Sequence, residues 1–275
     1  MKRAAPLYLI ALLLPSACIV PPNAAPMIDL DMGGVSQHNF RGVPMDENGA
    51  LQSTLSVSAP TVRKDGVLAM NIFANMALTD DNSGGALGSD NSREISRADY
   101  SLSYSEPLDD LDVVAGITHY TFPGNARGAM PGYGDYNSDY TSEGTTQLFG
   151  AASWDLWDLY PTVELFLDVD VASGVYLNTH IQRVFEWKEK TWFEARSNLA
   201  FAGADYAEAY YGKHETAVAD FGLSGKMLHE LNENTIVSAS VNFSTLLNSG
   251  YSDSLDNAGI DTSNAWIGLS AHWVW

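Results

Sequence analysis

Residues 235–246 read TIVSASVNFSTL, and this stretch decides the fold class. Its apolar residues alternate with serines and one asparagine, and they are Val237, Ala239, Val241 and Phe243. Successive side chains of a β-strand point to opposite faces, whereas a helix would not separate these two sets. The stretch therefore predicts a strand with one apolar and one polar face.

The same period-two pattern recurs on both sides of this stretch, interrupted by turn residues. We expect twelve strands, over roughly residues 28–41, 50–60, 67–78, 93–106, 111–122, 141–154, 159–172, 174–187, 191–204, 215–229, 234–247 and 264–275. An even number of such strands is typical of bacterial outer-membrane barrels, in which lipid-facing and lumen-facing residues alternate. The sequence therefore predicts an all-β protein, a single antiparallel transmembrane β-barrel.

The connections between these expected strands alternate in length. Short connections cover residues 61–66, 107–110, 155–158, 188–190 and 230–233, whereas longer ones cover 42–49, 79–92, 123–140, 205–214 and 248–263. Outer-membrane barrels have short periplasmic turns and longer extracellular loops, whereas a soluble sandwich does not sort its loops in this way. The tight joint near Ser173-Gly174 is the exception, and it predicts two long strands that meet in a small hairpin.

Composition and charge narrow the possible partners. Charged residues make up only 17% of the 275 residues, and no run of eighteen apolar residues follows residue 17. The formal net charge is −20, which repels nucleic acid and attracts cations or cationic solutes. A solvated acidic coat without any partner is the alternative interpretation.

The N-terminus predicts export. Lys2 and Arg3 precede an apolar stretch over residues 7–14, so residues 1–17 are interpreted as a signal peptide, residues 18–27 as a linker and residues 28–275 as the barrel. Cys18, the only cysteine, follows a stretch similar to the lipobox of lipoproteins, with Pro15 where that motif usually has leucine. Two interpretations stay open: lipidation of Cys18, or an ordinary cleaved signal with an incidental cysteine.

The last expected strand carries an assembly signal. Its outward residues end in Trp273 and Trp275, and Trp275 is the final residue. A terminal aromatic residue on an alternating last strand resembles the signal that the barrel assembly machinery reads. Other aromatic residues fall near the same predicted strand ends and are expected to form an interfacial girdle: Trp154, Trp157, Tyr160, Trp187 and Trp192.

Short motifs along the chain resemble a family of proteobacterial outer-membrane proteins, the TorF-type porin-like proteins. The motifs are Arg41-Gly42 before Ala50-Leu51-Gln52, the stretch HYTFPG over residues 119–124, and Asp168-Val169-Asp170 before Gly174-Val175-Tyr176. The resemblance spans most of the chain after the signal, but no defined substrate comes with it. What it implies is a passive channel.

The polar inward side chains would either line a narrow aqueous path or fill the lumen, because twelve strands lie between filled and open barrels. We expect Asp168 and Asp170 to face Tyr176 and Asn178 near the outer mouth. The predicted selectivity region for cations or small polar solutes comprises Arg97, Asp99, Asp168, Asp170, Asn178 and His180. Structural pairing is the alternative for each of them.

Enzymatic and metal chemistry find little support in the sequence. None of the six histidines is followed two positions later by serine, the spacing of barrel phospholipases, and no cofactor motif is present. Acidic loop stretches such as Asp80-Asp81-Asn82 and residues 253–261 would recruit calcium or bridge lipopolysaccharide phosphates, or serve only as turns. We therefore predict no enzyme, no cofactor and no defined metal site.

Two functions from different classes follow. The first is a porin-like channel of the outer membrane, in contact with lipid and lipopolysaccharide, for passive diffusion of small polar or cationic solutes. The second is a plugged barrel with a structural or surface-interaction role and no transport. The channel interpretation weakens if acids across the axis clamp all four of the inward bases, Arg41, Arg97, Arg196 and Lys226.

Overall fold

The computed structural model describes residues 25–61, 65–78, 95–122, 144–257 and 259–275. The predicted export segment with Cys18, most of the predicted linker, and the loop stretches around residues 80–82 and 123–140 lie outside these ranges. Nothing in the structure therefore bears on the fate of Cys18.

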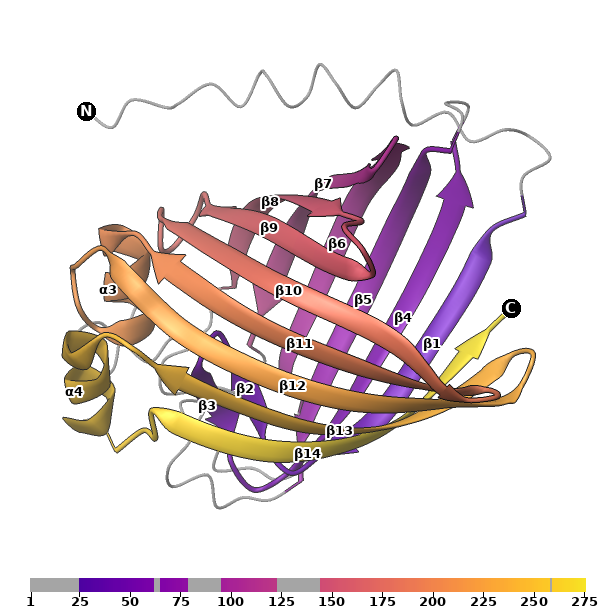
Figure 1. Cartoon of the computed structure of the whole chain (residues 1–275). Helices are drawn as coiled ribbons and strands as arrows, with labels where there is room; N and C mark the ends of the chain where they lie inside the picture. The colour runs from indigo at the N-terminus through magenta and orange to yellow at the C-terminus, as the bar shows by residue number, and fades with distance from the viewer. Residues whose placement is uncertain (1–24, 62–64, 79–94, 123–143, 258) are drawn as a thin grey trace.

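The described chain forms a closed antiparallel barrel of twelve strands (Figure 1). The strands are β1 (Met27–Val35), β4 (Ala50–Pro60), β5 (Val67–Ala77), β6 (Ile95–Leu108), β7 (Leu111–Thr121), β8 (Thr145–Trp154), β9 (Leu159–Asp168), β10 (Val175–Lys188), β11 (Thr191–Ala202), β12 (Ala217–Asn232), β13 (Thr235–Leu246) and β14 (Ser263–Val274). Each strand pairs with its neighbours in the chain, and β1 closes the ring against β14, with Leu30 opposite Trp273. The predicted twelve-stranded barrel is confirmed.

The two ends of the barrel differ. The end that carries the C-terminus and the start of β1 has the short turns, and we call it the periplasmic end. Two helices, α3 (Ala204–Tyr211) and α4 (Ser249–Asn257), lie together at the opposite end, which we call the loop end (Figure 1). Among the described helices none is long and apolar enough to span a membrane.

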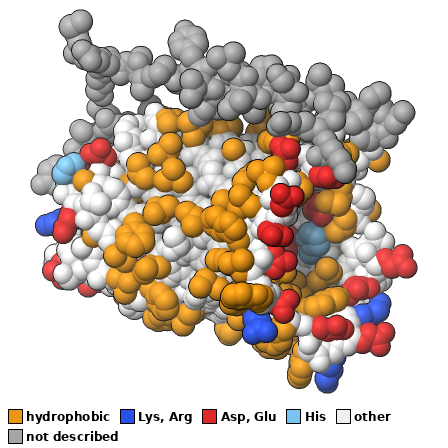
Figure 2. All heavy atoms as spheres, turned by 45° about the horizontal axis from the view of Figure 1, so that its top comes forward, with side chains coloured by type: hydrophobic (Ala, Val, Ile, Leu, Met, Phe, Trp, Pro, Cys, Tyr) orange, Lys and Arg blue, Asp and Glu red, His pale blue; other side chains and the backbone are white. Residues whose placement is uncertain are grey.

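The outer face of the barrel is apolar, as the alternation predicts. Val241, Ile267 and Leu269 are exposed by 60% or more, and hydrophobic side chains spread over the face seen in Figure 2. A closed ladder satisfies the hydrogen bonds of every strand, and only such a structure or a helix is stable in hydrocarbon. The architecture is that of an integral outer-membrane protein.

The first strand is shorter than predicted. We expected it to run over residues 28–41 and a loop to follow, but β1 ends at Val35. The next residues turn into the barrel as a separate hairpin of β2 (His38–Phe40) and β3 (Val43–Asp46). The period-two pattern up to residue 41 does not reveal the change of ladder, because the apolar side chains of the hairpin are buried inside the barrel and not at a lipid-facing wall.

Other segments at the loop end also differ from the prediction. β9 was expected to reach residue 172 but ends at Asp168, and the turn that follows holds Asp170. The long connections after β11 and β13 contain α3 and α4, which the sequence analysis treated as loops. The turn after β9 thus shortens a wall strand, whereas α3 and α4 form within segments that were expected to be loops.

The main hydrophobic core lies inside the barrel at the loop end. It is formed by Val43 of the hairpin, tyrosines of α3, Tyr251 and Leu255 of α4, and inward residues of β10 to β13. Tyr206, Tyr211 and Tyr251 have no exposed surface. The apolar parts of three connections, β1–β4, β11–β12 and β13–β14, thus pack against one another and against the wall.

The alternation allows a direct test of which strand face meets lipid. Val241 points outward in the middle of β13, whereas its neighbour Ser240 points inward and lines the lumen. Val241→Arg should lower the free energy of unfolding by about 2–4 kcal/mol in lipid vesicles, the cost of an arginine at the bilayer midplane. Ser240→Arg is the matched control and should cost clearly less in the same denaturant titration; equal losses would contradict the assigned faces.

Candidate functional site

The β2–β3 hairpin lies in the lumen, and a two-residue turn at its tip joins the two strands. Arg41 and Gly42 form this turn with φ values of 52° and 82°. A type I′ turn requires positive φ at both central residues, and its twist suits a tight hairpin. Gly42 also approaches the wall closely, because a Cβ atom there would lie 2.8 Å from Leu246 Cδ2 and 2.9 Å from Asp220 Cβ. Glycine is therefore required at this position on two grounds.

The guanidinium of Arg41 lies in a cage of aromatic rings. Its Cζ atom is 4.7 Å from the Phe40 ring centroid, 4.5 Å from that of Phe166 and 4.4 Å from that of Tyr176. Ring faces attract a cation at such distances, and most strongly when water is excluded. Arg41 also donates hydrogen bonds to Gln147 Oε1, at 2.8 Å, and to the hydroxyl of Tyr206.

Helices α3 and α4 hold the tip of the hairpin from the loop end. The Tyr211 hydroxyl donates to the carbonyl oxygen of Arg41 at 3.1 Å, and its ring stacks on Tyr251 at 4.8 Å. Burial raises the pKa of Tyr211 well above its usual range and that of Tyr251 to about 12. Both hydroxyls thus keep their protons at neutral pH and can act as donors.

The base of the hairpin is fixed to the opposite wall by a buried polar network. Asp46 Oδ2 accepts hydrogen bonds from Asn75 Nδ2 at 2.5 Å and from Ser96 Oγ at 2.8 Å. Beside them, Gln52 donates to Asn75 Oδ1 at 3.0 Å, and its Nε2 lies 2.8 Å from His38 Nδ1. The hairpin therefore crosses the lumen from the β4–β6 wall to the β8–β10 wall.

Two of the predicted selectivity residues, Arg97 and Asp99, form an ion pair on β6. Arg97 donates to both carboxylate oxygens of Asp99, at 2.8 and 2.6 Å, and both side chains are largely buried. The Arg97 Cζ atom lies 4.0 Å from the Phe40 centroid and 5.2 Å from that of Tyr120. The structure thus places this pair in contact with the hairpin, at Phe40.

Asp168 and Asp170 are not placed as the sequence predicted. Asp168 is 4% exposed and accepts hydrogen bonds from Thr145, Gln147 and the backbone N–H groups of residues 170, 172 and 173. Asp170 is exposed in the turn that these bonds organise. The expected pairing with Tyr176 and Asn178 is wrong, since the register sets these residues against Phe166 and Glu164. The inferred role of the two aspartates in selectivity stays a prediction.

Asn178 and His180 lie together on β10 around Glu164. Asn178 Nδ2 donates to Glu164 Oε2 at 2.6 Å, and His180 Nδ1 lies 3.6 Å from the same oxygen. Arg196 on β11 completes the group, 3.8 Å from Glu164 Oε2 and 3.0 Å from His180 Nδ1. The predicted residues thus fall into three separate settings, and in this one Asn178 lines a cavity of the lumen together with Glu164 and Arg196.

The four inward bases are not all clamped by acids across the axis. Arg97 pairs with an acid on its own strand, and Arg196 with one two strands away. Among the described residues no carboxylate lies within ion-pair distance of Arg41 or Lys226. The channel interpretation would weaken if acids across the barrel axis held all four bases, and the described residues do not show that arrangement.

Two polar cavities of about 410 Å³ each open inside the barrel. The first, the hairpin cavity, lies against the hairpin and is lined by Asn39, Arg41, Glu164, Asn178, Asn198 and Asp220, among others. The second, the lower cavity, is lined by Asp31, Gln52, Glu194, Lys226, Ser238 and Ser270, among others. Arg196, Ser224, Asn242 and Trp266 line both, so the two cavities adjoin.

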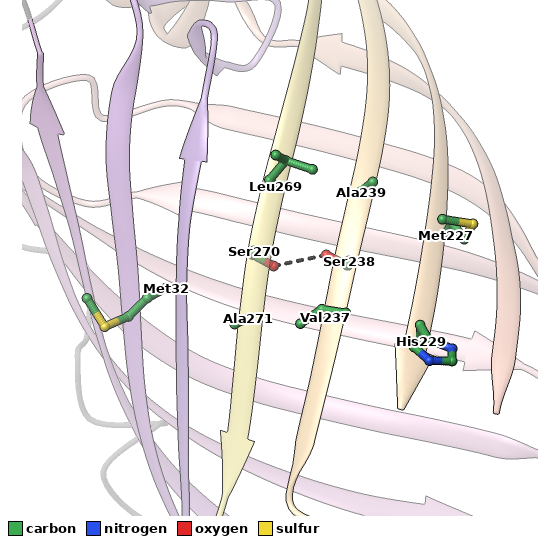
Figure 3. Close-up of a pocket in the computed structure, with 9 residues that line it drawn as sticks. All are labelled: Met32, Met227, His229, Val237, Ser238, Ala239, Leu269, Ser270 and Ala271. Atoms are coloured by element: carbon green, nitrogen blue, oxygen red, sulfur yellow. Dashed lines mark hydrogen bonds between the residues drawn. The ribbon is translucent and has the colours of Figure 1, made fainter. Parts of the chain in front are cut away.

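A third hollow lies on the outer face of the barrel (Figure 3). It has a volume of about 460 Å³ and is lined mainly by apolar residues of β1 and β12 to β14, including Met32, Met227 and Leu269. The hydrogen-bonded pair Ser238–Ser270, at 2.9 Å, forms part of its floor. This groove faces the lipid and lies outside the solute path.

Several residues of the site were missed in the sequence analysis. The tyrosines of α3 and the rings around Arg41 come together from distant segments, and no local sequence pattern predicts such contacts. The hairpin did leave a signal, because Arg41-Gly42 stands between two short stretches with apolar residues, as a tight turn would. We interpreted that signal as the end of the first wall strand.

The fit of Gly42 generates a test of the hairpin position. Gly42→Ala should push the tip away from Asp220 and Leu246 and expose the Arg41–Gly42 bond to trypsin, with a new N-terminus at residue 42 detected by mass spectrometry. Gly49→Ala is the matched control, because Gly49 also has positive φ, of 90°, but its added Cβ would have no neighbour nearer than 3.5 Å. Cleavage at Arg41 in the unaltered protein, or equally in both variants, would contradict the packed hairpin.

Comparison with known proteins identifies no family. No family model matches the chain, and no curated protein matches it, so the likeness to the TorF-type proteins stays an expectation. Solved structures are similar in fold: the NanC porin, with 12% identity, a TM-score of 0.48 and coverage of 89% of this chain and 98% of that one. An outer-membrane channel from Pseudomonas putida F1 has 10% identity, a TM-score of 0.48 and coverage of 94% and 98%. The KdgM porin has 8% identity, a TM-score of 0.44 and coverage of 90% and 98%.

Proposed function

We propose that the protein is a narrow outer-membrane channel for passive diffusion of small polar solutes, with a modest preference for cations. The observation that carries this proposal is the pair of adjoining polar cavities, which extend from the hairpin past Arg196 and Ser224 to Lys226 and Ser270 nearer the periplasmic end. Side chains would fill a lumen that serves only as a core, whereas these cavities are open and carry many polar side chains in their lining.

In this proposal the β2–β3 hairpin is the constriction. It narrows the loop end, and solutes pass along the β11–β14 wall, where both cavities lie. The second candidate is a barrel that this hairpin closes completely, and it is considered because the hairpin contacts several parts of the wall. The two candidates differ in whether the intact protein passes current.

The preference for cations rests on charge. The whole chain carries 34 acidic against 14 basic residues, and Asp31 and Glu194 line the lower cavity. A surplus of negative charge raises the local concentration of cations at the entrance and in the lumen. The effect is modest because Arg196 and Lys226 line the same cavity.

Single-channel recording in planar bilayers tests the proposal. The unaltered protein should give small, stable current steps, and replacement of residues 37–47 by a short glycine-serine linker should enlarge them several-fold, because the constriction is removed. Current only in the replacement variant would establish the plugged barrel instead. Absence of current in both would end the channel proposal, provided that both proteins show the heat-modifiable gel mobility of folded barrels.

The origin of the ion preference can be tested separately. Asp31→Asn should shift the reversal potential in a potassium chloride gradient toward zero, because one lumen carboxylate is lost. Asp109→Asn is the matched control, since Asp109 is exposed in the turn between β6 and β7, and it should change the reversal potential less. An unchanged value in Asp31→Asn, or a larger shift in Asp109→Asn, would show that the lower cavity does not set the preference.

We also propose that Trp273 and Trp275 form the signal read by the assembly machinery. Trp273 lies opposite Leu30 of β1, and the backbone of Trp275 exchanges two hydrogen bonds with that of Ile28, at 2.9 and 3.0 Å. The last strand therefore closes the barrel, which is the step that assembly has to complete.

A further inference from the structure

We infer that the hairpin cavity is a binding subsite for a neutral polyhydroxy compound of about the size of a monosaccharide. The inference deepens the proposed function, on which it rests, by naming the class of solute that the channel would take. It stands on the unpartnered polar atoms of the cavity, on the balance of its charges and on its shape.

Two acceptor atoms of the cavity have no hydrogen-bond partner among the described residues: Asn178 Oδ1 and Asn39 Oδ1. Asn178 is only 9% exposed. Its amide orientation is fixed, because Nδ2 donates to Glu164 and a flipped amide would set an oxygen against that carboxylate. Both oxygens expose less than 1 Å² of surface, so a ligand hydroxyl reaches them only after the side chain shifts toward the cavity. A buried acceptor without a partner is unfavourable, and pairing it with a ligand donor favours that shift.

The charged groups of the cavity are balanced and already engaged. Glu164 accepts from Asn178 and lies near His180 and Arg196, and Asp220 accepts from Tyr176 at 2.7 Å. Arg41 is held by its ring cage and by Gln147. Two acids and two bases thus line the cavity, so neither an anion nor a cation finds a free counter-charge.

What remains for a ligand is a set of neutral groups. Besides Asn39 and Asn178, the cavity wall carries Asn198, Asn242, Ser224 and Ser244. The amide nitrogens of Asn39, Asn198 and Asn242 each donate one hydrogen bond within the protein, to Ser244, Asp220 and Ser240. Amides and hydroxyls both donate and accept, which matches the hydroxyl groups of a neutral polyol. A ligand with several closely spaced hydroxyls therefore fits this lining better than a simple ion does.

The size and the aromatic lining of the cavity agree with this class. A volume of about 410 Å³ falls in the range of small-molecule sites, roughly 300–1,000 Å³. The indole of Trp266 lines the cavity and offers an apolar surface for the C–H face of a sugar ring. Trp266 also provides an optical reporter within the proposed site.

The test uses the folded full-length barrel in detergent micelles, titrated with D-glucose or D-galactose and followed by tryptophan fluorescence and calorimetry. We expect saturable binding of at least one of these sugars, and the fluorescence change should be lost in Trp266→Phe. Asn178→Ala should weaken binding about three- to tenfold, the effect of one hydrogen bond. Asn71→Ala is the matched control, because Asn71 lies on β5 and does not line the cavity, and it should leave the affinity unchanged.

Choline chloride and sodium glucuronate serve as the cationic and anionic arms of the titration. Tighter binding of either than of both neutral sugars would overturn the inference, as would the absence of saturable sugar binding or equal effects of Asn178→Ala and Asn71→Ala. A protein that conducts but binds neither sugar would lose the subsite and keep the channel. A protein that binds sugar with the expected response to Asn178→Ala but passes no current would keep the subsite and lose the channel.

Discussion

The loop end of the barrel is organised around one partly buried cation. The guanidinium of Arg41 cannot be left bare in the interior, and the structure surrounds it with ring faces and with hydrogen bonds to Gln147 and Tyr206 instead of an acid. These partners come from the wall strands, from the hairpin and from α3. Satisfying Arg41 therefore requires the hairpin to stay inside the barrel and α3 to cover it.

The rest of the lumen follows from that placement. With the hairpin fixed against β4 to β6 by Asp46 and against β8 to β10 by Arg41, the open space lies toward β11 to β14. Small inward side chains such as Ser224 and Ser240 leave room there. The wall itself needs no further explanation, because the closed ladder and the alternation of faces suffice for stability in a bilayer.

The sequence predicts the wall well and the interior poorly. The pattern of β13 holds in the structure because one face meets lipid and the other meets the lumen: Val241 and Phe243 are exposed on the outside, and Ser240 and Asn242 line the lumen. Residues 38–46 leave the wall, since the core inside the barrel buries the apolar side chains of the hairpin instead of exposing them to lipid. Asp170 was misplaced because the turn that Asp168 organises has no distinct pattern. The candidate site depends on contacts between distant segments, which periodicity does not encode.

Hydrogen–deuterium exchange of the barrel in lipid nanodiscs tests most directly whether the first loop is a packed element of the lumen. The Arg41-centred arrangement predicts that the amides of Val43, Met45 and Asp46 exchange at rates close to those of the neighbouring wall strands and far more slowly than the exposed turn around Lys190. Exchange of these amides as fast as in that turn would contradict the packed hairpin, and with it the constriction and the cavity that it bounds.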